Sequence, residues 1–298
     1  MIEPLKTKAG FVAVVGRPNA GKSSLLNWLI GEKLALVSHK ANATRKRLNM
    51  IAMHENAQII FIDTPGIHEQ ERLLNQFMLE EAMKAMGDCD LILFLTPVTD
   101  TLQHYADFLA LTKPDVPHIV LLTKTDTVSQ TVLLDKITQY QAYQDKFAAL
   151  IPVSVKKGIS QSYLLETISR FIPEHPYLYD PEILTTERSR DIYKELIREA
   201  IFEYTSDEVP YFSDVLIDKV EEKESIDHIY ATIVVDKKSQ KGIIIGKEGQ
   251  TLKRIGSHAR RLIEELSQKR LFLKLVVAVK QGWSQDKELL KKIGYIVE

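Results

Sequence analysis

One stretch of this 298-residue chain has the residue types and the spacing to hold a polyphosphate. It consists of Gly16, Arg17, Pro18, Asn19, Ala20, Gly21, Lys22 and Ser23. An apolar run over residues 11–15 precedes it, and a helical pattern over residues 24–30 follows it, beginning with Ser24. Backbone N–H groups in such a turn converge on an anion, and the following helix adds the positive end of its dipole. Glycine lets the backbone approach phosphate oxygens where a Cβ would clash. The lysine would reach the β- and γ-phosphates, and the serine hydroxyl would ligate Mg²⁺.

A carboxylate follows a second apolar strand, which the sequence predicts over residues 58–62. Asp63 closes this strand and is placed to hold the coordination shell of Mg²⁺. Gly66, three residues later, can turn its N–H toward a γ-phosphate. The candidate nucleotide-binding residues of this stretch are Asp63, Thr64, Pro65 and Gly66.

The base of the nucleotide is indicated by two later motifs, because turns of this kind hold ATP and GTP alike. After an apolar strand over residues 118–122, Asp126 can accept from the ring N–H and the exocyclic amine of guanine, a donor pair that adenine lacks. The Lys124 stem would cover the base, and a backbone N–H beyond the next strand, assigned to Val155, would donate to guanine O6. An ordinary strand end explains each short match equally well, but their order indicates GTP. The candidates are Thr123, Lys124, Asp126, Ser154, Val155 and Lys156.

The elements that must position these residues alternate between strand and helix. Strands are predicted over residues 11–15, 48–53, 58–62, 90–95, 118–122 and 150–153, and helices over 24–30, 78–86 and 105–111. This alternation predicts an α/β fold with a doubly wound, mostly parallel sheet of the P-loop NTPase type, whose ligand lies at the carboxyl ends of the strands. Three prolines within residues 173–181 mark an extended connector. We therefore expect a nucleotide-binding domain over 1–175, a linker over 176–187 and a second domain over 188–298.

The second domain carries a Gly-x-x-Gly turn within an α-β-β-α-α-β pattern. The predicted elements are a helix over 188–204, strands over 214–220 and 229–235, helices on either side of the turn, and a strand over 271–279. Such a turn can press backbone amides against a sugar–phosphate chain, and residues 241–280 hold ten Lys/Arg against three acids, a local charge of +7. A glycine turn beside a solvated basic helix is the alternative, but the element order favours an α+β type II KH domain. The candidate RNA-binding residues are Gly246, Lys247, Glu248, Gly249, Lys253, Arg254, Arg260 and Arg261.

A short helix over residues 284–292 ends the second domain, after Trp283. The indole could stack on RNA, although packing of the terminal helix onto the sheet is the preferred interpretation. Overall composition is that of a globular protein, with 45% hydrophobic residues and a net charge of −1. One cysteine, Cys89, fits a reducing compartment, and no apolar run approaches the length of a membrane span. A cytoplasmic protein is the expectation.

These motifs resemble the Era family of translation-factor-type GTPases over nearly the whole chain. Further marks of the resemblance are Val209–Tyr211, Lys237–Lys241, Ala259–Arg260 and Gln281–Trp283. The resemblance implies a G domain that cycles between GTP and GDP with Mg²⁺, with switch I around residues 38–47 and switch II from residue 63. It also implies a monomer in the cytoplasm whose KH domain holds single-stranded 16S rRNA near its 3′ end on the maturing small (30S) subunit. A peripheral contact with the cytoplasmic face of the inner membrane is left open.

Three residues depart from the family pattern. Thr123 stands where the family has Asn, which predicts intact guanine specificity with weaker affinity. Ala43 replaces the first of two threonines, which leaves Thr44 to sense the γ-phosphate and Mg²⁺. Val155 replaces alanine, which a backbone contact tolerates. The resemblance thus implies a catalytic set of Lys22, Thr44 and Gly66 and a metal set of Ser23, Thr44 and Asp63.

Slow hydrolysis is expected, because Ile67 occupies the position at which Ras-like enzymes place a water-orienting glutamine. By analogy with unassisted GTPases, the intrinsic rate should be about 10⁻⁴ to 10⁻² s⁻¹. His68, Glu69 and Gln70 are nearby alternatives for orienting the water, although each is more simply a solvated loop residue. Two other functions stay open: a GTPase whose C-terminal module binds protein or membrane partners, and an RNA chaperone whose nucleotide is only structural.

Overall fold

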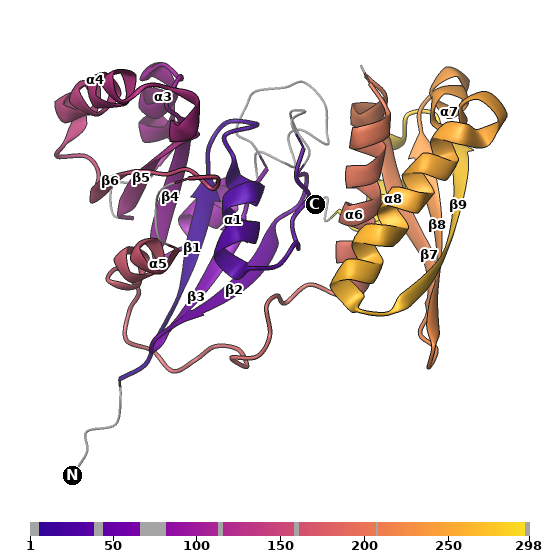
Figure 1. The fold of residues 1–298 in the computed structure, drawn as a ribbon, viewed down its shortest axis with the longest axis horizontal. Coiled ribbons are helices and arrows are strands. Elements are labelled where there is room, and N and C mark those ends of the chain that lie inside the picture. The colour runs from indigo at the N-terminus through magenta and orange to yellow at the C-terminus, as the bar shows by residue number, and fades with distance from the viewer. Residues whose placement is uncertain are drawn as a thin grey trace, which may run out of the picture. The chain divides into compact units, whose positions relative to one another are not determined.

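The computed structural model describes residues 6–38, 44–65, 82–112, 116–157, 161–206 and 208–295. Clustering of contacts divides them into two compact units (Figure 1). Among the described residues, the N-terminal unit comprises 6–32, 44–65, 82–112, 116–157 and 161–186. The C-terminal unit comprises 33–38, 187–206 and 208–295.

The N-terminal unit is built on a six-stranded sheet with the order β2-β3-β1-β4-β5-β6. Only β2 runs antiparallel to its neighbour, and the other pairs are parallel. Every residue of β3, β4 and β5 is buried, which explains their continuous apolar runs. The strands are β1 (Lys8–Val15), β2 (Leu48–His54), β3 (Ala57–Asp63), β4 (Leu91–Pro97), β5 (His118–Thr123) and β6 (Ala149–Pro152).

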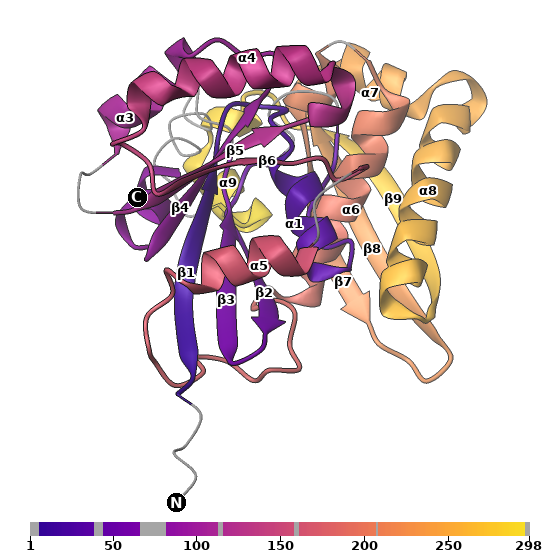
Figure 2. The ribbon, with the colours of Figure 1, turned by 60° about the vertical axis from the view of Figure 1, so that its left-hand side comes forward.

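Helices cover both faces of this sheet (Figure 2). Helical residues 82–87, α3 (Gln103–Leu111) and α4 (Gln130–Tyr140) pack on one face, around an aromatic core that includes Phe94, Tyr105 and Phe108. On the other face, α1 (Lys22–Ile30) contacts α5 (Gln161–Ser169). The predicted doubly wound, mostly parallel α/β sheet is confirmed. Of the helix predicted over 78–86, residues 78–81 lie outside the described residues.

The proline-containing connector is hydrogen-bonded to the N-terminal unit. The buried Gln58 side chain accepts from the backbone N–H groups of Leu178 (2.8 Å) and Tyr179 (3.0 Å) and donates to the Tyr179 carbonyl at 2.8 Å. Farther along, the Thr185 hydroxyl donates to the Asn49 carbonyl at 2.6 Å. The segment predicted as a linker therefore lies against β2 and β3 as far as residue 186.

The C-terminal unit has the predicted α-β-β-α-α-β order. Its sheet runs β7-β8-β9, with β7 antiparallel and β9 parallel to β8. Apolar side chains at helical spacing, including Ile255, Ala259 and Leu262, bury one face of α8, which packs against α6 and β9. The elements are α6 (Ser189–Tyr204), β7 (Ser213–Glu221), β8 (Ile226–Val235), α7 (Lys238–Ile245), α8 (Gln250–Ser267), β9 (Arg270–Val279) and α9 (Lys287–Ile293).

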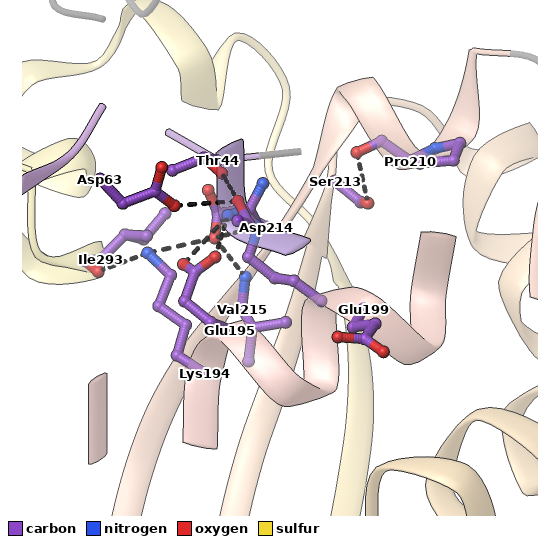
Figure 3. Close-up of polar contacts among 12 residues, drawn as sticks. Thr44, Asp63, Lys194, Glu195, Glu199, Pro210, Ser213, Asp214, Val215 and Ile293 are labelled. Carbon is purple, nitrogen blue, oxygen red and sulfur yellow. Dashed lines mark hydrogen bonds and ion pairs between the residues drawn. The ribbon is translucent and has the colours of Figure 1, made fainter. Parts of the chain in front are cut away.

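The terminal segment is anchored within this unit by buried polar contacts (Figure 3). Asp214 is fully buried, pairs with Lys194 at 3.2 Å and accepts from the Tyr295 hydroxyl at 2.5 Å. Lys194 also donates to the Ile293 carbonyl at 2.9 Å. Trp283 is 1% exposed, and its indole N–H donates to the Phe212 carbonyl at 2.9 Å. Packing, the preferred interpretation of this tryptophan, is therefore what the structure shows.

Candidate functional site

The loop between β1 and α1 has the backbone form of a phosphate-binding turn. At Gly16, where φ is +154°, a Cβ would overlap the carbonyl oxygen of Leu95, so only glycine lets the loop pass this close to β4. Gly21, with φ of +99°, ends the loop as the N-cap of α1. Asn19 also has a positive φ, of 62°. The turn therefore brings backbone N–H groups to the amino end of a helix, an arrangement that suits an anion.

Lys22 is buried beneath this loop. Its ammonium group donates to the carbonyls of Gly16 (3.0 Å) and Arg17 (3.2 Å). Burial lowers the pKa of Lys22 to about 8, with Asp63 opposing and Arg17 adding to that shift. A polyphosphate in the loop would supply the negative charge that favours the protonated lysine.

Three oxygen-bearing side chains from separate segments converge beside the loop. The Ser23 hydroxyl donates to Asp63 at 2.9 Å and lies 3.1 Å from the Thr44 hydroxyl. One carboxylate and two hydroxyls form a hard oxygen donor set that fits Mg²⁺, which takes few protein ligands and completes its shell with phosphate and water. The structure thus brings together all three residues of the predicted metal set.

An ion pair that the sequence analysis did not identify fixes the first turn of the loop. The Arg17 guanidinium binds both carboxylate oxygens of Asp100, which follows β4, and one of these bonds is 2.5 Å long. Asp100 is 9% exposed, and its carbonyl accepts from Lys136 at 2.8 Å. The Arg17 charge also helps to lower the pKa of Lys124, after the larger effect of burial. No sequence motif links Arg17 to Asp100, because they are 83 residues apart.

The threonine that departs from the family pattern is joined to the phosphate loop. Thr123 is buried at the end of β5, and its hydroxyl donates to the carbonyl of Ala20 at 2.7 Å. A side-chain hydrogen bond between the base-binding and phosphate-binding loops is therefore present without an asparagine. Lys124, next in the chain, has a positive φ of 59° and is exposed.

The two predicted guanine motifs meet through their side chains. Ser154 is 4% exposed and donates to Asp126 at 2.7 Å, while its oxygen accepts from the N–H groups of Lys156 (3.1 Å) and Lys157 (3.0 Å). The bond from Ser154 is the main cause that lowers the pKa of Asp126, which stays ionised and accepts hydrogen bonds. Val155, which stands between Ser154 and Lys156 in the chain, is 39% exposed. Ser154 thus orients the carboxylate that is predicted to select guanine.

The remaining predicted residues around the nucleotide are placed as follows. Pro18 follows Arg17 in the loop, Ser24 is half-buried in α1, and Pro65 follows Thr64. The buried Thr64 hydroxyl donates to the Val14 carbonyl at 2.7 Å, so it joins the chain just after β3 to β1. Outside the described residues lie Ala43, Gly66, Ile67, His68, Glu69 and Gln70.

The Gly-x-x-Gly turn joins α7 to α8 and has a constrained backbone. A Cβ on Gly246, where φ is +71°, would overlap the side chain of Thr251, and Gly249 has φ of +76°. Between them, Lys247 and Glu248 are exposed, and Glu248 takes a positive φ of 52°. The loop therefore presents both side chains to solvent while its backbone bends tightly.

The predicted RNA-binding residues of α8 are divided among different surroundings. Lys253, Arg254 and Arg261 line a shallow basic cavity of about 550 Å³ with Tyr204 of α6. Arg260 is exposed and is not part of this lining. The helical spacing of the cations thus aims three of them toward α6, which the sequence motif alone did not resolve.

Comparisons with known proteins agree with this geometry. Residues 11–124 match a family described as 50S ribosome-binding GTPase, and residues 208–284 match the KH domain family. The chain is 52% identical to GTPase Era of Campylobacter concisus, over 97% of this chain and 100% of that protein. It is 50% identical to GTPase Era of Helicobacter pylori (strain 26695), over 98% of each chain.

Two solved structures are similar over the same length. A variant of Aquifex aeolicus Era bound to GDP and AlF₄⁻ has a TM-score of 0.93 and 33% identity, over 98% of this chain and 100% of that one. Era in complex with MgGDPNP and nucleotides 1506–1542 of 16S ribosomal RNA has a TM-score of 0.93 and 34% identity over the same shares. Fold and site together define a P-loop GTPase joined to a KH domain. The chain belongs to the Era family, and it hydrolyses GTP.

Proposed function

We propose that this protein is a Mg²⁺-dependent GTP switch that binds single-stranded 16S rRNA during small-subunit assembly. The observation that carries the nucleotide assignment is the convergence of separate loops at the carboxyl ends of β1, β3, β5 and β6. Thr123 joins the base-binding loop to the phosphate loop, and Ser154 orients Asp126. Related Era structures with GDP–AlF₄⁻ and with MgGDPNP support GTP, GDP and Mg²⁺ as the ligands.

Hydrolysis follows from the placement of charge around the transferring phosphoryl group. Lys22, released from the loop carbonyls, would bind the β- and γ-phosphates and stabilise the charge that develops in the transition state. Ser23, Thr44 and Asp63 would hold Mg²⁺, which bridges the phosphates and neutralises their charge. Gly66 would donate its N–H to the γ-phosphate.

The RNA assignment rests on the KH unit. The Gly246–Gly249 turn would press backbone against the sugar–phosphate chain, with Lys247, Glu248 and the α8 cations as contacts. The related Era complex with nucleotides 1506–1542 supports 16S rRNA as the target. We infer that GTP favours RNA binding, that hydrolysis releases the RNA, and that the protein acts on the 30S subunit as a cytoplasmic monomer.

A peripheral contact with the inner membrane is a separate part of the proposal. Among the described residues, no helix combines the length and apolar character needed to cross a bilayer. The resemblance to the family leaves open a peripheral contact, which would use surface residues.

The Asp126→Asn variant tests the nucleotide assignment. An amide donates where the carboxylate accepts, so the variant should lose GTP and gain xanthosine triphosphate, whose ring pattern is complementary. Affinities for both nucleotides, measured by calorimetry, should exchange their order. The Asp135→Asn variant, changed at a residue of α4, is the control and should keep the wild-type order. Unchanged GTP preference in Asp126→Asn would refute the assignment.

A further inference from the structure

The face of the KH sheet that points away from α6 and α8 carries an unassigned set of side chains. Burial alternates along β8, so that Ile229 and Ala231 are buried while His228 and Tyr230 are partly exposed. Along β9 the residues classed as exposed are Arg270, Phe272, Lys274 and Val276. Since successive strand residues point to opposite faces, these side chains share the outer face.

Strand register brings the aromatic rings of this face together. Phe272 is the register partner of His228, and Tyr230 is that of Lys274. The Phe272 ring centroid lies 5.1 Å from that of His228 and 6.2 Å from that of Tyr230. Phe272 is nevertheless 45% exposed, so much of its ring is accessible to solvent.

Cations flank this aromatic group, and Glu221, the register partner of His228 on β7, already has cationic partners. Arg270 and Lys274 stand two residues either side of Phe272 on the edge strand. On β7, Glu221 pairs with Lys219 and Lys223, while Asp218 accepts from the Thr232 hydroxyl at 2.8 Å. Positive charge beside exposed rings is complementary to bases and phosphates.

An apolar protein partner fits this face less well. Phe272 and Val276 are its most exposed apolar residues, at 45% and 50%, and the charged Lys274 stands between them. They form no continuous apolar patch of the kind that nucleates a protein interface. At one end of the sheet Asp214 of β7 lies opposite Val234 of β8, and both residues are buried. The exposed part of the outer face is therefore limited to the positions level with His228, Tyr230 and Thr232.

We propose that this outer face is a second single-stranded RNA platform, on which unpaired bases stack against Phe272, His228 and Tyr230 while Arg270 and Lys274 contact phosphates. The proposal rests on the proposed RNA-binding function of the KH unit. Helix α7, which precedes the Gly-x-x-Gly turn, packs against β9. An RNA longer than the roughly four nucleotides that a Gly-x-x-Gly turn clamps can therefore continue around this edge strand.

RNA length separates the two surfaces experimentally. Fluorescent single strands of four and ten nucleotides from the 16S 3′ end are titrated into the full chain. Phe272→Ala and Phe272→Leu should each lower the affinity for the ten-nucleotide strand about tenfold, the effect of losing one base stack. Neither variant should change the affinity for the four-nucleotide strand. The double variant Lys247→Asp, Glu248→Asp should lower the affinity for both strands. Tyr163→Ala, which removes a 53% exposed ring in α5, is the control and should change neither.

Crosslinking gives an independent reading. Ten-nucleotide RNA carrying 4-thiouridine should crosslink to peptides from β8 and β9 in the wild-type chain and lose those adducts in Phe272→Leu. Wild-type affinity of both Phe272 variants for the long strand, or equal losses for both lengths, would overturn the platform. A wild-type chain that binds neither strand would instead overturn the proposed RNA function.

Discussion

At the scale of single residues, hydroxyl groups connect the loops of the nucleotide site. Thr123 reaches the phosphate loop, Ser154 orients Asp126, and Ser23 contacts Asp63. Each bond joins segments that are distant in sequence, so the loss of one hydroxyl should loosen two loops. A mutation that removes the hydroxyl while preserving side-chain shape isolates this effect.

Thr123→Val should speed nucleotide release. The valine leaves the Ala20 carbonyl without this donor, a loss of about 1–3 kcal/mol, or roughly 5- to 150-fold in affinity. The measurement is the dissociation rate of fluorescent GDP. Thr123→Ser keeps the hydroxyl and should stay near the wild-type rate. Equal rates for the Ser and Val variants would show that the hydrogen bond does not hold the loops.

A buried histidine predicts acid sensitivity of the N-terminal unit. Burial lowers the pKa of His118 to about 4, and its ring lies 2.8 Å from the Tyr105 hydroxyl. In the unfolded chain the His118 imidazole has its ordinary pKa of 6.5 and binds a proton below that pH, whereas in the folded chain it stays neutral down to about pH 4. The free energy of unfolding should therefore fall by about 3 kcal/mol as pH falls from 6.5 toward 4.

Urea unfolding across that pH range measures the effect. His118→Gln should flatten the dependence, whereas His104→Gln, at an exposed residue of α3, should retain it. A pH dependence that persists unchanged in His118→Gln would assign the acid sensitivity to other groups.

At the scale of elements, parallel strands end at one edge of the sheet and so place their loops side by side. The ion pair between Arg17, after β1, and Asp100, after β4, joins two such loops across the core of the site. Removal of Asp100 would leave the Arg17 charge beside Lys124 without its partner. We therefore expect the pair to act as one unit in nucleotide binding.

A double-mutant cycle tests this unit. Arg17→Gln and Asp100→Asn should each weaken GDP binding, and the double variant should be little worse than either, with a coupling free energy of about 1–2 kcal/mol. Calorimetric affinities for GDP give the cycle. Additive losses would show that the two side chains act independently.

At the scale of the whole molecule, sequence patterns predicted what depends on local order. Strand–turn–helix contexts located the phosphate loop, and the α-β-β-α-α-β order located the KH unit. The Arg17–Asp100 pair and the outer sheet face were missed, because each depends on strand register between distant segments. The connector was predicted to be an extended segment, but its hydrogen bonds to Gln58 were not, because a lone glutamine in a strand carries no such signal.

The proposed switch requires that the bound guanine nucleotide change the affinity of the KH unit for RNA. Affinity for the ten-nucleotide 16S strand, measured with a non-hydrolysable GTP analogue and then with GDP, tests it most directly. We expect tighter binding with the analogue, by a coupling free energy of about 1–3 kcal/mol, or roughly 5- to 150-fold in affinity. Equal affinity in the two nucleotide states would contradict it.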